Sequence, residues 1–280
     1  MIKLITDSTS DIEKQEAEKY GITIVPLKVI MEGNDYRDRV DLNAEDFYPL
    51  LEQCDNLPTT SQPSPQDFLT IYEKAKEAND SIIVITLSSA ISGTYQSACI
   101  AKDLLDYEDV HIIDSLNATQ GLHILVKKAV QLIQEGKEAK DIVSFLEEYK
   151  KRIHIFAVVD TLEYFYKGGR LSKTSAAMGT LLKFKPVVGL KEGKLELFDK
   201  ARGTMKATAK ILELIQEHGE IDLQEPIFLG YTGTSVGLDK FCEQLRDHLL
   251  FTNEEYGIVG PVIGTHAGPG AKLIAYVNKA

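Results

Sequence analysis

Residues 82–98 read IIVITLSSAISGTYQSA, and this stretch decides the fold class. It opens with an uninterrupted run of isoleucine and valine, which is typical of a strand buried on both faces of a sheet. A turn of serine and glycine follows, and a helical spacing of apolar residues begins at Gly93. A buried strand that feeds directly into a helix is the repeating unit of a parallel α/β sheet.

The same alternation of strand and helix continues on both sides of this stretch. Short apolar runs, which we predict to be strands, occupy residues 2–6, 22–30, 81–87 and 110–113. Helical patterns separate them at residues 11–20, 44–53, 65–78, 93–105, 119–135 and 139–153. We therefore predict an N-terminal α/β domain over residues 1–153, with a mostly parallel sheet and helices on both faces.

The pattern of predicted strands and helices changes near residue 153. Residues 153–159, IHIFAVV, form another buried-strand pattern, and Pro186–Leu190 and Lys194–Phe198 flank a Lys-Glu-Gly turn that predicts a β-hairpin. Further strands are predicted at 227–231, 257–264 and 272–277, and helices at 204–218, at 235–249 and after a capping Ser172. We therefore predict a second α/β domain, with a mixed sheet and helices, over residues 154–280.

Composition narrows the function classes. The 280 residues carry a formal net charge of −11, which repels phosphodiester backbones, so we expect no nucleic acid partner. The same charge disfavours standing attachment to anionic lipid, so we expect at most a transient contact with a membrane. The three cysteines form no CxxC pair, no run approaches the ~18 apolar residues of a membrane span, and the N-terminus lacks a signal-peptide layout. We expect a cytoplasmic protein.

The turn from Ser92 to Thr94 is the first candidate binding site. The first turn of a helix exposes unpaired N–H groups and carries a partial positive charge, and Ser92 and Thr94 add hydroxyl donors. Gly93 would let an anion approach the backbone closely. Such a cradle can hold a carboxylate or a phosphate without a cation. The alternative interpretation is a serine-rich helix cap that serves the helix alone.

Three further segments carry candidate groups. The proline-stiffened loop LPTTSQPSP, residues 57–65, presents the hydroxyls of Thr60 and Ser61, or is a plain surface connector. His266 lies in a glycine-rich turn after a predicted strand, where it can donate to a carboxylate or face solvent. Arg170 follows a Gly-Gly pair and can reach an anion or brace a loop.

Five motifs, in this order, resemble the DegV family of bacterial fatty-acid-binding proteins. They are TDSTSD at residues 6–11, TSQPS at 60–64, SSAISGTY at 88–95, KGGRL at 167–171 and GTHAGPG at 264–270. Each motif is weak alone, but the ordered set spans nearly the whole chain. The resemblance implies a two-domain α/β protein that binds one long-chain, palmitate-like fatty acid, with the tail in an apolar tunnel.

The resemblance also implies the roles of individual residues. It implies that Thr60 and Ser92 hold the carboxylate, and we expect His266, which matches the histidine of the glycine-rich turn, to bind the head group with them. Arg170 matches the arginine after the Gly-Gly pair and is expected to support the site. Their supporting neighbours are Ser61, Gly93 and Thr94. Some members of the family present the bound acid to a separate fatty acid kinase for phospholipid synthesis, and Arg202 is a candidate partner-docking residue by its position.

Energetics favour a lipid-transport carrier over an enzyme. A saturated tail of ~15 methylenes, at ~0.8 kcal/mol each, supplies roughly 12 kcal/mol before ordering costs, so uncharged donors suffice for the head group. We expect no catalytic residue, no metal and no cofactor besides the bound acid. The chain also has no GxxxxGK[ST] loop, which argues against a free-standing kinase.

Two other functions stay open. A serine hydrolase could use Ser92 with His266 and an aspartate such as Asp7 or Asp114, although the GxSxG elbow is absent. A phosphate-ligand-binding regulator could use the same cradle. It predicts a small polar pocket instead of a long apolar one.

Overall fold

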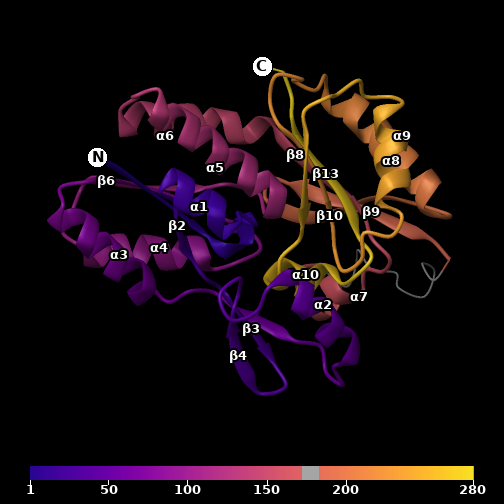
Figure 1. The fold of residues 1–280 in the computed structure, drawn as a ribbon, viewed down its shortest axis with the longest axis horizontal. Coiled ribbons are helices and arrows are strands. Elements are labelled where there is room, and N and C mark those ends of the chain that lie inside the picture. Colours follow the sequence, from indigo (N-terminus) through magenta and orange to yellow (C-terminus); the bar gives the residue numbers. More distant parts are fainter. Residues whose placement is uncertain (172–182, 280) are drawn as a thin grey trace.

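The computed structural model describes residues 1–171 and 183–279. The strands of these residues form three sheets, which we call the N-terminal, the small and the C-terminal sheet (Figure 1). The N-terminal sheet has four parallel strands in the order β2-β1-β6-β7. Its strands are β1 (Ile2–Asp7), β2 (Thr23–Val25), β6 (Ser81–Thr86) and β7 (Val110–Asp114).

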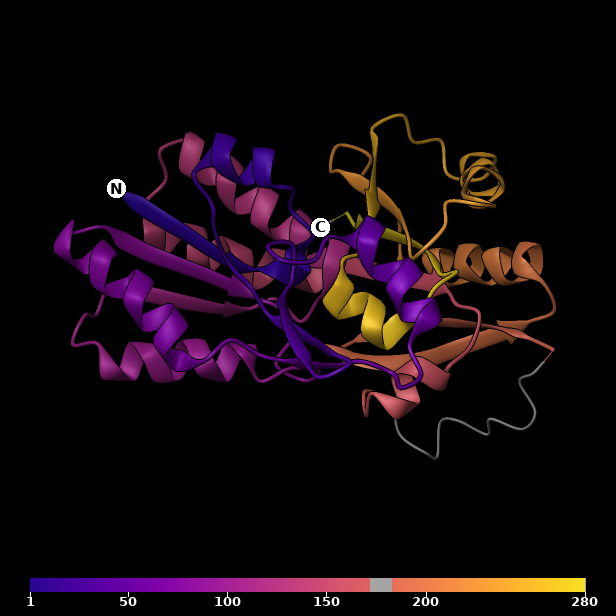
Figure 2. The ribbon, with the colours of Figure 1, turned by 60° about the horizontal axis from the view of Figure 1, so that its bottom comes forward.

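Helices cover both faces of the N-terminal sheet (Figure 2). They are α3 (Pro65–Glu77), α4 (Thr94–Leu104), α5 (Thr119–Gln134) and α6 (Ala139–Tyr149). Successive residues of a strand point to opposite faces, so Ile82 and Val84 of β6 join the apolar core beneath α3 and α4. Ile83 and Ile85 join the core beneath α5 and α6. The predicted parallel sheet with helices on both faces is confirmed.

The single strand predicted over residues 22–30 is wrong, because the chain makes two strands there. Pro26 has no N–H with which to continue the pairing of β2, and the chain turns away after it. The second strand builds the small antiparallel sheet, in the order β4-β3-β5, which the sequence pattern does not predict. Its strands are β3 (Lys28–Met31), β4 (Asn34–Arg37) and β5 (Thr59–Ser61).

Two helices of the N-terminal half compare differently with their predictions. α2 (Ala44–Gln53) has the predicted bounds, and Asn43 caps it by accepting from the N–H of Asp46 at 2.9 Å. α1 (Lys14–Tyr20) begins later than predicted. The reason is local, because Asp11 ends a short 3-10 turn in the left-handed conformation, with φ 56°.

The C-terminal sheet has six strands in the order β10-β9-β8-β13-β11-β12. β11 and β12 pair in parallel and the other neighbours are antiparallel, so the predicted mixed sheet is confirmed. Its strands are β8 (Ile153–Val158), β9 (Lys185–Lys191), β10 (Lys194–Ala201), β11 (Ile227–Tyr231), β12 (Glu254–Ile258) and β13 (Lys272–Val277). The predicted hairpin is β9–β10, whose turn residues Glu192 and Gly193 both have positive φ, as a two-residue hairpin turn of type I′ requires.

One prediction in the C-terminal half is wrong and another is too long. The strand predicted over residues 257–264 ends at Ile258, and α10 (Pro261–Ala267) follows, because Pro261 is preorganised for the first position of a helix. α9 (Leu238–Arg246) begins after Gly237, later than predicted, whereas α8 (Thr204–His218) has the predicted bounds. The helix predicted after Ser172 lies outside the described residues.

The two larger sheets meet across α5, which contacts strands of both (Figure 1). Asp11 reinforces this junction: its carboxylate accepts from Arg39 Nη2 at 3.2 Å and from the N–H of Gly260 at 3.0 Å, and the Thr119 hydroxyl also donates to it. The sheets change near Ile153, and the domain limits 1–153 and 154–280 stay a prediction. Within the part of the chain that the structure describes, no helix combines the length and apolar character needed to cross a membrane.

Candidate functional site

A cavity of about 370 Å³ lies between the C-terminal sheet and the carboxyl ends of the N-terminal strands. β8 shows how the chain makes its wall. Phe156 and Val158 pack under α8 and α9, whereas the alternate residues face the cavity. Most of the lining is apolar, and it includes Ile155, Ala157, Val159, Leu190, Leu195, Val262, Ile263 and Leu273.

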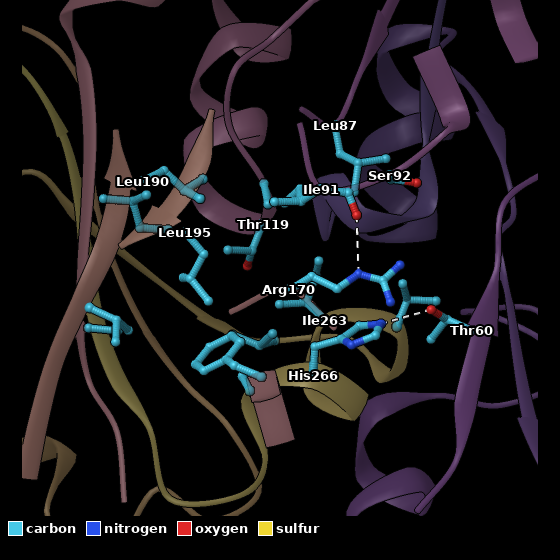
Figure 3. A pocket seen from close by; sticks show the side chains of 18 of the residues that line it. Thr60, Leu87, Ile91, Ser92, Thr119, Arg170, Leu190, Leu195, Ile263 and His266 are labelled. Atoms are coloured by element: carbon cyan, nitrogen blue, oxygen red, sulfur yellow. Dashed lines mark hydrogen bonds between the residues drawn. The ribbon is translucent and has the colours of Figure 1, made fainter. Parts of the chain in front are cut away.

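Several of the polar groups that line this cavity gather on one side, whereas Thr119 lies between them and Leu195 (Figure 3). Thr60 and Ser61 reach it from β5, Ser92 from the turn before α4, and His266 from the last turn of α10. Figure 3 shows Thr60, His266 and the Arg170 guanidinium together, with Leu190 and Leu195 on the far side. The cavity therefore has a polar end and an apolar end.

His266 joins two parts of the chain at the polar end. Its Nε2 lies 2.8 Å from Thr60 Oγ1, and the residue is only 8% exposed. Burial, together with the nearby Arg170 cation, lowers the pKa of His266 to about 3, so the ring is neutral at physiological pH. The predicted position in a turn after a strand is wrong, because this residue lies in α10.

The neutral ring carries one proton, and its surroundings decide where. Nδ1 has no hydrogen-bond partner among the described residues and faces Gly168, where a Cβ would come within 2.2 Å of it. A buried N–H without a partner is costlier than an unused lone pair, so we assign the proton to Nε2. His266 then donates to Thr60, which leaves the Thr60 hydroxyl proton free to point into the cavity.

Arg170 combines the two roles that its motif left open. Its Nε donates to the carbonyl oxygen of Ile91 at 3.2 Å and its Nη1 to that of Gly168 at 2.6 Å, so it braces two loops. It also lines the cavity beside His266 (Figure 3). Burial lowers the pKa of Arg170, but a guanidinium stays charged in proteins. The cradle expected to work without a cation therefore has one beside it.

The turn before α4 is both a cap and part of the lining. Ser92 Oγ lies 3.0 Å from Thr94 Oγ1 and accepts from the Thr94 N–H at 3.3 Å, while Thr94 itself is buried behind it. Gly93 also lines the cavity, and the expected close approach of an anion to its backbone stays a prediction. A Cβ there would lie 2.0 Å from Gln62 Oε1, so a larger residue would have to displace the end of the Gln62 side chain.

The hydrolase alternative finds no support in the hydrogen bonds of the described residues. Asp7 accepts from the N–H of Leu87 at 2.7 Å, and Asp114 accepts from the N–H of Ser89 at 3.1 Å. His266 contacts Thr60 and not Ser92. The small polar pocket predicted for a phosphate regulator also differs from this largely apolar cavity. In residues 1–171 and 183–279 no three His, Cys, Asp or Glu side chains are placed to share a metal ion.

One residue predicted from the sequence lies outside the cavity, and some residues that line the cavity were not predicted. Arg202 does not line the cavity; it is exposed, with its guanidinium 5.4 Å from the ring centroid of Phe184. Gln62 and Thr119 line the cavity and were not predicted. The apolar wall was also missed, although every second residue of the 153–159 run was the available signal.

Known proteins resemble this chain in both sequence and structure. A family model described as an uncharacterised protein of the DegV family matches residues 1–279. A DegV domain-containing protein of Caldanaerobacter subterraneus is 38% identical over 278 residues, 99% of each chain. A structure described as the fatty acid binding of a DegV family protein from Thermus thermophilus has a TM-score of 0.89 at 33% identity, with 99% of both chains covered. A stearic acid-binding protein from Eubacterium ventriosum has a TM-score of 0.88 at 28% identity, with 99% of this chain and 98% of its own covered.

Proposed function

The chain belongs to the DegV family, and from that premise we propose that it binds one long-chain fatty acid and acts as its carrier. The observation that carries this proposal is the division of the cavity into a polar end and an apolar end. A fatty acid has the same division. The fatty acid bound by the Thermus relative and the stearic acid bound by the Eubacterium relative support the same ligand class.

The apolar end supplies most of the binding free energy in this proposal. A palmitate-like tail buries methylenes worth ~0.8 kcal/mol each, which sums to roughly 12 kcal/mol before ordering costs. The wall from β8, α10 and the β9–β10 hairpin offers apolar side chains for that tail.

The polar end compensates for removing the carboxylate from water. An unpaired buried carboxylate would cost several kcal/mol, so donors are required. We assign this role to the hydroxyls of Thr60 and Ser92, with His266 orienting Thr60 by donating to it. The Arg170 cation beside them favours the ionised form of the acid. Ser61, Gly93 and Thr94 support the loops that carry these groups.

We further propose that the carrier presents its acid to a fatty acid kinase in the cytoplasm, with Arg202 at the docking surface. The free thiols of Cys54, Cys99 and Cys242 support a reducing compartment. Arg202 is exposed and outside the cavity, so Arg202→Ala should leave fatty acid affinity unchanged and slow phosphorylation of the bound acid by the kinase. Equal phosphorylation rates in Arg202→Ala and wild type would remove Arg202 from that role.

The central proposal is tested by the lipid that accompanies the purified protein. The protein is denatured, extracted and examined by mass spectrometry, and we expect close to one fatty acid per chain. A protein that is empty and also fails to take up added palmitic acid would contradict the carrier. Ester turnover that disappears in Ser92→Ala would favour the hydrolase instead.

A further inference from the structure

The β9–β10 hairpin overhangs the sheet that carries it. β9 pairs with β8 from Val187 to Gly189, so Leu190 and Lys191 lie beyond the last paired position. On its other side β9 pairs with β10, which is the edge strand of the sheet. A two-stranded hairpin is marginally stable without further support. The tip therefore depends on what it contacts outside its own sheet.

A contact with the N-terminal half holds this tip. Gly193 is buried at the turn, and its carbonyl oxygen accepts from Ser88 Oγ at 2.8 Å. Ser88 is fully buried. A Cβ at Gly193 would lie 2.3 Å from Ser88 Oγ and 3.2 Å from Leu116 Cδ2, so the tip is seated closely against both residues. Because a buried carbonyl is costly to leave unpaired, the hydrogen bond fixes the position of the tip.

The same hairpin carries one wall of the cavity. Leu190 and Leu195 are paired with each other next to the turn, and both line the cavity. In Figure 3 they lie on the side away from Thr60, where the tail of a bound acid would run. Any movement of the tip would move these two side chains and change the space at the apolar end.

We propose that the contact between Ser88 and Gly193 limits the length of the acyl chain that the protein accepts. Ser88 is then a positioning residue for specificity, because it holds Leu190 and Leu195 in place through the hairpin tip. This inference rests on the proposed function, since it requires the tail to occupy the apolar end. Loosening the tip admits methylenes that the native wall excludes, each worth about fourfold in affinity.

The test is the chain-length profile of Ser88→Ala in the full-length protein. Dissociation constants are measured for myristic, palmitic, stearic and arachidic acid by displacement of a fluorescent fatty acid. We expect the affinity for arachidic acid relative to palmitic acid to rise about 15-fold or more, as two or more further methylenes become buried. The backbone N–H of Ser88 still donates to the carbonyl of Asn117, at 2.8 Å, so the loop should keep its path.

The chain-length profile distinguishes the positioning role of Ser88 from a general structural role. Ser88 Oγ also accepts from the N–H of Ala90 at 3.2 Å, and losing that bond near Ser92 would weaken all acids by one common factor. A common factor, or a profile identical to wild type, would overturn the inference. Lys194→Ala is the matched control, because Lys194 is exposed on the same hairpin and should leave the profile unchanged.

A second variant approaches the contact from its other side. Gly193→Ala forces a Cβ against Ser88 Oγ and should displace the tip, so it should favour the longer acids as Ser88→Ala does. If Ser88→Ala fails to fold, this variant alone decides, and an unchanged profile overturns the inference. A wild-type protein that binds none of the acids is a different result, because it removes the proposed function itself.

Discussion

Thr60→Val is the substitution that most directly probes the head-group site. It removes one hydroxyl and keeps the branched shape of the side chain. In the structure Thr60 Oγ1 lies 2.8 Å from Nε2 of a neutral His266, which leaves its own proton for the ligand. A hydrogen bond to a charged group contributes ~1.5–3 kcal/mol, so palmitic acid should bind roughly 10- to 150-fold more weakly.

The assay compares two ligands with the same tail. Dissociation constants for palmitic acid and its methyl ester are measured by fluorescence displacement, and the ester should lose much less affinity because it carries no charge. Ser92→Ala should weaken the acid in the same selective way. Thr59→Val is the matched control, since Thr59 is exposed on the same strand and does not line the cavity.

Two results would refute this reasoning. An unchanged affinity of Thr60→Val for the acid would mean that the hydroxyl does not contact the carboxylate. An equal loss for acid and ester would mean that the substitution acts on the tail or on the fold. Melting temperatures of all variants, measured without ligand, show whether the second explanation applies.

Three further predictions concern buried ionisable groups. Because burial and Arg170 lower the pKa of His266 to about 3, its imidazole NMR signals should stay constant from about pH 8 to about pH 4 in ligand-free protein and titrate near ~6.5 after unfolding; a folded-state midpoint above about 5 would contradict this. Burial raises the pKa of Asp38 to about 7, so its bound proton stabilises the fold below pH ~4 and this stability is lost as the pH rises through about 7. The melting temperature of Asp38→Asn should therefore rise relative to that of wild type as the pH increases from about 5 to about 8. A difference that stays constant over this range would reject the effect. Arg39→Ala strands the buried Asp11 carboxylate and should lower the free energy of unfolding in urea by ~3–5 kcal/mol, whereas Arg37→Ala, which breaks an exposed pair with Asp41, should lower it far less; equal losses would contradict the contrast.

Local sequence patterns were sufficient to predict a helix or hairpin where the residues that determine it lie close together in the chain. α2 and α8 have the predicted bounds because a 3.6-residue apolar period agrees there with a boundary signal, which is the Asn43 cap at the start of α2 and a glycine at each end of α8. The β9–β10 hairpin was predictable from a Glu-Gly turn between two alternating runs. In these places the energy that selects the structure comes from residues close together in the chain.

The errors occur where a single backbone feature overrides an apolar run. Pro26 splits the run over residues 22–30, and the piece after it pairs in a different sheet. The run from Gly257 contains Pro261, which starts a helix and not a longer strand. Apolar character alone does not separate a short buried helix from a strand, so α10, which carries His266, was assigned to the wrong class.

The motif residues of the site were visible in the sequence, but their arrangement was not. Thr60 and His266 are 206 residues apart and meet only because the small sheet packs against α10. The place of Arg170 beside the cradle, and the Gln62 side chain against Gly93, likewise depend on contacts between distant segments. No local pattern encodes such distances.

The amino-acid sequence by itself determined the α/β class, most helices and strands, and the polar groups that a carboxylate would require. Each of these follows from periodicity, capping or residue chemistry within a short window. The tertiary structure alone decided that a cavity exists, that Thr60, Ser92 and His266 share one end of it, and that a hairpin tip anchored at Ser88 borders the other. The physical reason is that a cavity is what packing leaves unfilled, and packing depends on the meeting of all segments at once.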